Sequence, residues 1–599
     1  MLGAIKLQEW IHRFELGTGA RYVRWFLALA GFIAVAALYD FFCFRGMNNA
    51  EAMDAAQLGR NIGEGRGFQT FCVRPLSVSL TARHRDDRTS LLKEGHPDIS
   101  NPPVYPLLLA PLLRVTPSAQ DLALLKNFTV YPGDLFIAFL NQVLLGLGML
   151  LVFRLALAWF DPTVAWISAI LFVLTELYWR FSVSGLSTVL LMDVVLVLVW
   201  ILSAFERGSR ESAGTRRLVW LALAAGAVTA MAMLTRYSLG WLIVPVLVFV
   251  AVCATGQRIK LTGIAFLAFV VIGGPWLARN VVSSGWIFGT ATYAPFADTF
   301  IFPGDTLERS ILPQFRGLPG HTWTLLSALT QKTVTGTRDI LITELPRLGG
   351  NWLWAFFLIG LLVRFQNVNP SRLRWFVTGT LALMVPVQAL ARTHLSVEAP
   401  QINSENLLVV FSPLVLVFGV GLFFVLFDSL QMPTPALRYG ALAVFVIVIS
   451  LPMFLAFAPP RPRTTSPPYY PPRIQQVSRY LNTNELMMSD IPWAVAWYGE
   501  RQCVSVTLNW RKDFFEINDY QKTVNGLYVS TRTTDTKFFS TWFAGENRGW
   551  GAFLLQALVR REVPGGFPLR RAPEGLFTNG ELLLMDRDRW SDKGGGESF

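Results

Sequence analysis

Cysteine and charged residues are both scarce in this chain of 599 residues. Only 4 cysteines are present and no two stand in a CxxC pattern, which excludes a disulfide framework and argues against a cysteine-bound metal. Charged residues make up 15% of the chain, against about 25% in an average soluble domain. The signatures GxxxxGKS/T, HExxH and GxSxG are missing, so the common nucleotide-binding loops, zinc peptidases and serine hydrolases are excluded.

Apolar residues are abundant instead. They make up 52% of the chain, with 20 Trp and 45 Phe, and the mean hydropathy is +0.42. Because a membrane-spanning helix needs about 20 mostly apolar residues, the sequence predicts an α-helical polytopic membrane protein. We predict eleven spans, of which the eighth is the shortest: 24–44, 133–153, 162–179, 187–205, 218–234, 239–255, 261–278, 351–363, 375–391, 406–427 and 439–458.

The net charge of +12 follows the predicted topology. If the N-terminus is cytoplasmic, most of the excess of Arg and Lys falls in cytoplasmic segments, whereas the short outer loops offer only Arg180, Arg236 and Arg392. This distribution obeys the positive-inside rule and fixes the orientation. The same distribution explains the positive net charge without a nucleic-acid partner, so we exclude nucleic acid as a partner. We therefore expect a multi-pass membrane protein with a cytoplasmic N-terminus and a C-terminal domain on the outer side.

Three long segments lie on the outer side in this topology. Residues 45–130 and 279–350 are outer loops, and residues 459–599 follow the last span. Within the last segment, 485–490, 494–499 and 503–508 are predicted as strands or buried segments, and 525–530 as a further strand. The chain thus divides into a cytoplasmic interfacial segment (1–23), a transmembrane module (24–458), a proline-rich linker (459–473) and a small periplasmic α/β domain (474–599).

The first outer loop carries the most suggestive chemistry. An Ala-rich run after Asn49, a suitable N-cap, predicts a short helix at the membrane surface. Glu51 and Asp54 are three residues apart and therefore share one face of this helix. Two acids near a helix start also have a purely structural explanation, since they interact favourably with the helix dipole.

Further motifs follow in a fixed order. The helix leads into GEGRGF (63–68) and VRPL (73–76), and the loop closes with HPD (96–98) before NPPVYP (101–106). LTR (234–236) follows the fifth span, PWLARN (275–280) ends the seventh, and SDIPW (489–493) lies in the C-terminal segment. This series resembles the polytopic GT-C glycosyltransferases, in particular the bacterial protein-mannosyltransferase-like and aminoarabinose-transferase-like enzymes, and the resemblance covers most of the chain.

The resemblance implies transfer of a sugar from a polyprenyl-phosphate donor to an acceptor glycan, lipid or protein on the periplasmic side. A carboxylate would take the proton of the acceptor hydroxyl. We prefer Asp54, which lies a turn deeper in the helix, although the spacing to Arg60 supports Glu51 equally well. Cations, either Arg side chains or a divalent metal ion, would stabilise the leaving phosphate. Candidate metal ligands are Asp54 and Asp98, and the candidate substrate-binding residues are Arg74, His96, Asp98, Tyr105, Arg236, Arg279 and Glu405.

The chain departs from the family pattern in two places. Many members have adjacent Asp and Glu after the first span, whereas here Glu51 and Asp54 are separated. Near the tenth span many members carry Arg-Tyr, but this chain has Ser404-Glu405-Asn406-Leu407, so an Arg expected to bind phosphate is missing or replaced. The alternatives are therefore a non-catalytic membrane protein that binds a glycan or a protein, and a flippase of lipid-linked sugars.

Overall fold

The computed structural model describes most of the chain. The described residues are 18–85, 91–115, 130–212, 214–254, 256–311, 321–348, 352–363, 368–398, 402, 406–430, 434–458, 469–545, 548–573 and 580–590. The predicted interfacial segment up to residue 17 and linker residues 459–468 lie outside this set.

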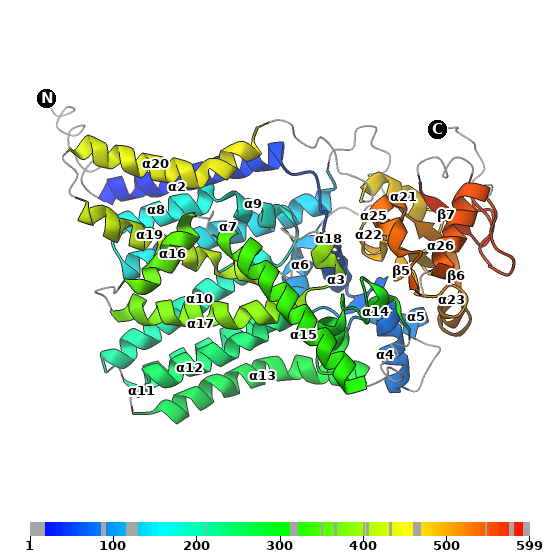
Figure 1. Ribbon diagram of the computed structural model, residues 1–599, viewed down its shortest axis with the longest axis horizontal. Helices are drawn as coiled ribbons and strands as arrows, with labels where there is room; N and C mark the ends of the chain where they lie inside the picture. The colour runs from blue at the N-terminus through cyan, green and yellow to red at the C-terminus, as the bar shows by residue number, and fades with distance from the viewer. Residues whose placement is uncertain are drawn as a thin grey trace.

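A bundle of apolar helices forms one half of the molecule (Figure 1). Eight helices among the described residues are long and apolar enough to cross a membrane, and the number rises to 10 if two bent helix pairs count as spans. With the 3-10 turn η6 (Leu407–Phe411) counted into α19, the eight are α2 (Thr18–Phe42), α7 (Pro132–Trp159), α10 (Thr188–Arg210), α11 (Thr215–Thr235), α13 (Arg258–Ser284), α17 (Val368–Ala391), α19 (Ser412–Ser429) and α20 (Pro435–Ala456).

Helices occur at all eleven predicted places, but three of the predicted spans are not single long helices. The third span is broken at Thr175, whose extended backbone separates α8 (Pro162–Leu174) from α9 (Glu176–Val183) by a bend of 52°. The sixth is shortened, because a 3-10 turn, η2 (Tyr237–Leu242), precedes α12 (Ile243–Cys253). The eighth, α16 (Trp352–Leu362), is short and lies at 102° to the helix before it.

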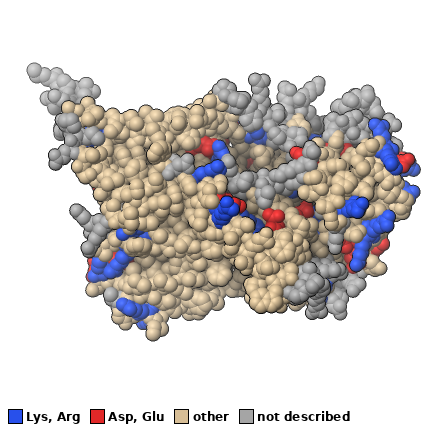
Figure 2. Space-filling model, in the orientation of Figure 1, with Lys and Arg blue, Asp and Glu red and all other residues tan. Residues whose placement is uncertain are grey.

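The charge distribution agrees with a membrane environment. Figure 2 shows charged side chains at one end of the bundle and near its junction with the α/β domain, with an uncharged belt between them. Ion pairs at the end of the bundle join Arg210 and Arg372 to Glu206, and Arg438 to Asp428. The long apolar helices and this belt identify a multi-pass membrane protein.

The predicted outer segments gather at the other end of the bundle (Figure 1). They contain α3 (Ala50–Gly63), α4 (Pro75–Arg85), α5 (Leu91–Glu94), α6 (Val104–Leu113), η3 (Gly289–Phe296), α14 (Thr306–Arg309) and α15 (His321–Asp339). Helix α15 packs against α17. Helices α3 and α5 contact the C-terminal α/β domain, whereas α4, α6 and α15 contact the bundle, so these elements are placed to build a site at the membrane surface.

A five-stranded sheet forms the centre of the α/β domain. Its order is β2-β5-β4-β6-β7, parallel except for the antiparallel β7 (Leu582–Met585) at one edge. Strands β4 (Leu486–Ser489), β5 (Gln502–Ser505) and β6 (Val524–Val529) confirm three predicted segments, and residues 494–499 fall largely in a buried helix, α22 (Pro492–Tyr498). The other edge strand, β2 (Cys72–Val73), comes from the first outer loop and pairs Cys72 with Cys503 in register. The loop and the domain thus share one sheet.

Candidate active site

Close packing against α6 fixes the position of α3. A Cβ atom on Gly59 would lie 2.9 Å from Cβ of Leu109, and one on Gly63 would lie 2.6 Å from the carbonyl oxygen of Ala110. Only glycine permits this approach of the two helices. Asn49 precedes α3 in the extended conformation expected of an N-cap, although its side chain makes no capping hydrogen bond. The start of α3, with its acids, is therefore held at the end of the bundle.

Buried polar contacts attach the C-terminal domain to α3 and to α7. Arg60, on α3, donates to the carbonyl oxygens of Ala496 (2.6 Å) and Trp497 (2.8 Å) in α22. Asp134, at the start of α7, accepts from the Trp497 indole and the Tyr498 hydroxyl, both at 2.8 Å. Sequence reasoning missed Asp134, because its partners lie over 360 residues away along the chain.

A cavity of about 610 Å³ opens between α3, the outer loops and the ends of the membrane helices. This volume is typical of small-molecule sites. Its lining combines two kinds of side chain. Apolar residues from α17 and from the turn before α12 include Trp241, Leu383, Pro386, Val387 and Leu390. Polar residues include Glu51, Arg74, Asn101, Tyr105, Arg236 and Glu308. A ligand with an apolar tail and a charged, polar headgroup matches this lining.

The two acids of α3 have different environments. Glu51 lines the cavity with 24% of its side chain exposed, and its Oε1 lies 3.9 Å from Nη2 of Arg236. Asp54 is buried, with 1% exposed. Its oxygens accept from Arg74 (2.8 Å), Asn101 (3.1 Å) and Gln57 (3.1 Å). The carboxylate of Asp54 is thus already engaged, and Glu51 is the acid of α3 that a ligand can reach.

Arg74 joins Asp54 to the cavity. Besides the bond to Asp54, its Nε lies 3.6 Å from Oε2 of Glu308, which also lines the cavity. Burial alone would lower the pKa of Arg74, but the neighbouring Asp54, Cys72, Glu308 and Asp98 together outweigh burial and hold the pKa well above its usual range. Arg74 therefore carries a permanent positive charge at the cavity, and its ion pair with Asp54 holds that charge in position.

Arg279 has a structural position rather than a place in the cavity. Its guanidinium donates to the carbonyl oxygen of Asp98 and stacks over the rings of Phe68 and Trp276, at 5.4 and 4.8 Å from their centroids. The cavity lining does not include it. The predicted substrate contact of Arg279 is thus not supported by its geometry, which instead holds the closing part of the first loop against α13.

His96 and Asp98 also lie behind the cavity wall. His96 is fully buried, with Nε2 2.9 Å from the Ser77 hydroxyl. Asp98 caps its own turn by accepting from the main-chain N–H groups of Ser100 (2.9 Å) and Asn101 (2.7 Å). Burial raises the pKa of Asp98, and the nearby Asp54 raises it further. Neither residue faces the cavity, so their predicted contacts with substrate are not supported.

The two acids predicted as metal ligands, Asp54 and Asp98, are engaged by other partners. Across the described residues, no group of three or more His, Cys, Asp or Glu side chains is placed to hold a metal ion. Of the two candidate ligands, Asp54 is paired with Arg74 and Asp98 bonds to main-chain N–H groups. These residues do not fit a divalent-metal site, and the positive charge at the cavity comes from Arg74 and Arg236.

The two remaining candidates are Tyr105 and Glu405. Tyr105 lines the cavity, and its hydroxyl donates to the carbonyl oxygen of Gly185 at 2.8 Å. Glu405 lies outside the described residues. Sequence reasoning missed Glu308, because it stands in a long loop without a recognisable pattern. Asn101 could have been proposed from the sequence, because it is the first residue of the NPPVYP motif.

His96 gives the protein a specific dependence on pH. Burial lowers the pKa of His96 to about 4, below the value of about 6.5 in an unfolded chain. Between these values the unfolded state binds the proton and the folded state does not, so stability is lost as pH falls. We expect a decrease in the free energy of unfolding of about 3 kcal/mol from pH 7 to pH 4 at this site. Unfolding of the detergent-solubilised protein should show a smaller decrease for His96→Gln than for the exposed control His84→Gln; equal decreases would contradict the assignment.

The comparisons with known proteins agree with this architecture. Residues 131–277, from α7 to most of α13, match the family model described as dolichyl-phosphate-mannose-protein mannosyltransferase. No curated protein sequence matches the chain. Among solved structures, the archaeal oligosaccharyltransferase AglB from Archaeoglobus fulgidus, in complex with an inhibitory peptide and a dolichol-phosphate, is 10% identical with a TM-score of 0.53. The alignment covers 89% of this chain and 72% of AglB.

Two further structures show weaker similarity. ArnT from Cupriavidus metallidurans in the apo state is 12% identical over 87% of this chain and 95% of its own, with a TM-score of 0.37. An Archaeoglobus fulgidus oligosaccharyltransferase in complex with Zn and sulfate is 12% identical over 87% and 70%, with a TM-score of 0.49. The resemblance predicted from the motifs is confirmed: the chain has the fold of the GT-C glycosyltransferases, and its residues 131–277 match a mannosyltransferase family of that class.

Proposed function

We propose that the chain is a membrane glycosyltransferase that moves a sugar from a polyprenyl-phosphate donor to an acceptor on the periplasmic side. One observation carries this proposal. In a cavity lined by apolar and polar side chains, the accessible carboxylate of Glu51 lies 3.9 Å from the guanidinium group of Arg236, and Arg74 lines the same cavity. An acid beside fixed positive charge, at the boundary between membrane and water, suits a lipid-linked phosphate as leaving group.

The reaction assigns a role to each of these side chains. The acceptor hydroxyl attacks the anomeric carbon, and Glu51 takes its proton as the new carbon–oxygen bond forms. The bond between that carbon and the phosphate oxygen breaks, and the phosphate keeps the electron pair. Arg236 and Arg74 stabilise the added negative charge. Asp54 is a positioning residue in this scheme, because it holds Arg74 and does not line the cavity.

The comparisons support the donor class. The matched family is described by dolichyl-phosphate-mannose, and AglB, which shares the fold, was solved with a dolichol-phosphate. The apolar wall of Trp241, Leu383 and Pro386 offers this chain a surface for the first part of a prenyl tail. The sugar would then lie toward the polar side chains, beside Glu51.

The division into a transmembrane module and a periplasmic domain, with a cytoplasmic N-terminus in a bacterial inner membrane, is part of the proposal. A periplasm-dependent reporter fused after Phe599 should be active, and a cytoplasm-dependent reporter inserted at 207–217 should also be active. Cytoplasmic activity of the fusion after Phe599 would place the cavity on the wrong side for a periplasmic acceptor and would overturn this orientation.

Removal of divalent cations tests the assignment of charge to arginine. Because the described acids form no metal site, transfer should change by less than about two-fold when the purified protein is treated with EDTA. A loss of about 100-fold or more that Mg²⁺, Mn²⁺ or Zn²⁺ restores would show that a metal ion stabilises the leaving phosphate instead.

Mass analysis of lipids and glycans from cells with and without the gene tests the function itself. We expect loss of the gene to raise one polyprenyl-phosphate sugar and to remove that sugar from one envelope component. An unchanged glycan and lipid profile would favour the non-catalytic binding protein. A donor lipid that accumulates only in the cytoplasmic leaflet would favour the flippase.

A further inference from the structure

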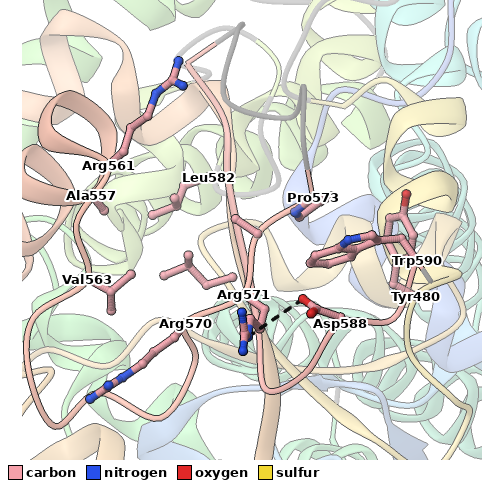
Figure 3. Close-up of a pocket in the computed structure, with 12 residues that line it drawn as sticks. Tyr480, Ala557, Arg561, Val563, Arg570, Arg571, Pro573, Leu582, Asp588 and Trp590 are labelled. Atoms are coloured by element: carbon pink, nitrogen blue, oxygen red, sulfur yellow. Dashed lines mark ion pairs between the residues drawn. The ribbon is translucent and has the colours of Figure 1, made fainter. Parts of the chain in front are cut away.

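A second cavity lies in the C-terminal α/β domain, apart from the candidate active site. It measures about 600 Å³, and none of its lining residues lines the first cavity. Figure 3 shows Arg571 and Asp588 facing each other at its centre and Trp590 beside Tyr480 on one side. Arg561, Arg570, Val563 and Leu582 lie on the other side.

The arginines of this cavity differ from others in the same domain. Arg589 and Arg473 form close ion pairs, at 2.6 Å with Glu485 and 2.7 Å with Glu581. Within the described part of the chain, Arg561 and Arg570 have no carboxylate at ion-pair distance. Arg571 reaches Asp588 only at 3.9 Å, and both of these side chains are largely exposed. Among the described residues, the cavity lining therefore carries an excess of positive charge, with Arg561, Arg570 and Arg571 against Asp588.

The rest of the lining is suited to a sugar ring. Trp590 and Tyr480 stand nearly perpendicular, with ring centroids 6.2 Å apart, so they form an aromatic corner. Leu582 and Leu584, both from β7 (Leu582–Met585), also line the cavity but are almost fully buried. Aromatic rings stack on the apolar faces of pyranoses, while a few polar groups fix their orientation.

The backbone holds this arrangement in place. Arg571 bridges to the edge strand β7, where Met585 N–H donates to its carbonyl oxygen at 2.7 Å. Arg561 adopts the left-handed conformation, with φ of 56°, at the end of the helical segment η9 (Gln556–Arg560). This conformation is unfavourable for a residue with a Cβ atom and accumulates at binding sites.

We propose that this cavity binds an acidic glycan, a saccharide that carries carboxylate or phosphate groups. Guanidinium groups bind such anions through paired N–H donors, and the aromatic corner would receive the adjoining sugar ring. The proposal goes beyond sugar transfer, because binding here requires neither the donor lipid nor Glu51. The domain would thereby hold an acidic saccharide chain close to the membrane enzyme.

Calorimetric titration of the full-length protein in nanodiscs tests the proposal. The probes are octagalacturonic acid, neutral maltooctaose and inorganic phosphate. We expect octagalacturonic acid to bind at least about ten-fold more tightly than either of the other two probes. Its affinity should also fall when the NaCl concentration is raised from about 50 to about 300 mM. Equal affinity for maltooctaose, tighter binding of phosphate alone, or no binding of octagalacturonic acid would overturn the proposal.

Matched variants test whether octagalacturonic acid binds in this cavity. The double variant Arg561→Gln with Arg571→Gln should lower the affinity for octagalacturonic acid at least about ten-fold. Trp590→Ala should lower this affinity about three-fold or more. The control, Arg560→Gln with Arg511→Gln, removes the same charge from exposed positions outside the cavity and should change affinity less than two-fold. Equal loss in both double variants would show only non-specific attraction and would contradict the site. If the cavity variant does not fold, Arg561→Gln alone carries the same test, with an expected loss of about three-fold.

Discussion

Replacing Glu51 by Gln is expected to lower the rate of sugar transfer by about 100- to 10,000-fold, the usual contribution of a general base. The amide keeps the size of the side chain but cannot accept the acceptor proton. Glu51 is partly exposed at the cavity, so the variant should fold and should bind the donor lipid as the wild type does. Initial rates of transfer in membranes, together with donor affinity, measure the effect.

Three other variants show whether the effect belongs to Glu51. Glu64→Gln, at the exposed end of α3, should leave transfer unchanged. Glu308→Gln removes the other acid of the cavity and should reduce transfer by less than about ten-fold. Asp54→Asn should lower the melting temperature as well as transfer, because Arg74, with only 13% of its side chain exposed, loses its closer anionic partner. A larger loss in the Glu308 variant than in the Glu51 variant would assign the base to Glu308.

Replacing Arg236 by Gln is expected to lower the turnover number by about 100- to 1,000-fold, as loss of one group that stabilises a developing charge commonly does. The phosphate gains negative charge as it leaves, so the effect should fall mainly on kcat rather than on KM. Arg236 lines the cavity beside Glu51. Steady-state rates over a range of donor concentrations separate the two constants.

The matched control is Arg338→Gln, on the exposed face of α15 and outside the cavity, which should keep full activity. Arg236→Lys should retain part of the turnover, because the charge remains while the paired donors are lost. A rise in KM at constant kcat would mean that Arg236 only binds the donor and does not stabilise its departure.

The sequence was sufficient for the helices and for the surface that carries the acids. Long apolar runs depend on local composition, so helices appear at all eleven predicted places. The broken third span and the shortened sixth could not be predicted, because Thr175 changes the backbone at a single residue inside an apolar run, and the 3-10 turn η2 extends into the apolar start of the sixth span. The Ala-rich run after Asn49 likewise predicted α3, and with it the shared region of Glu51 and Asp54.

The division of roles among the candidate residues could not be predicted in the same way. Spacing places Glu51 and Asp54 on one face but does not say which one a partner occupies, and that partner, Arg74, comes from another element. His96, Asp98 and Arg279 stand in motifs beside the cavity, yet each turns toward other main-chain or side-chain partners. The pairing of Cys72 with Cys503 joins segments that share no local signal.

Release of polyprenyl phosphate tests the central claim most directly. The substrate is the labelled donor lipid that accumulates in cells lacking the gene, and the enzyme is the purified full-length protein in nanodiscs with membrane extract as acceptor. We expect the wild type to release polyprenyl phosphate in step with transfer of the sugar, and Glu51→Gln to bind the donor with the same affinity but to release it at least about 100-fold more slowly. Binding of the donor without release by the wild type, or equal release by both proteins, would contradict catalysis by Glu51 in this cavity.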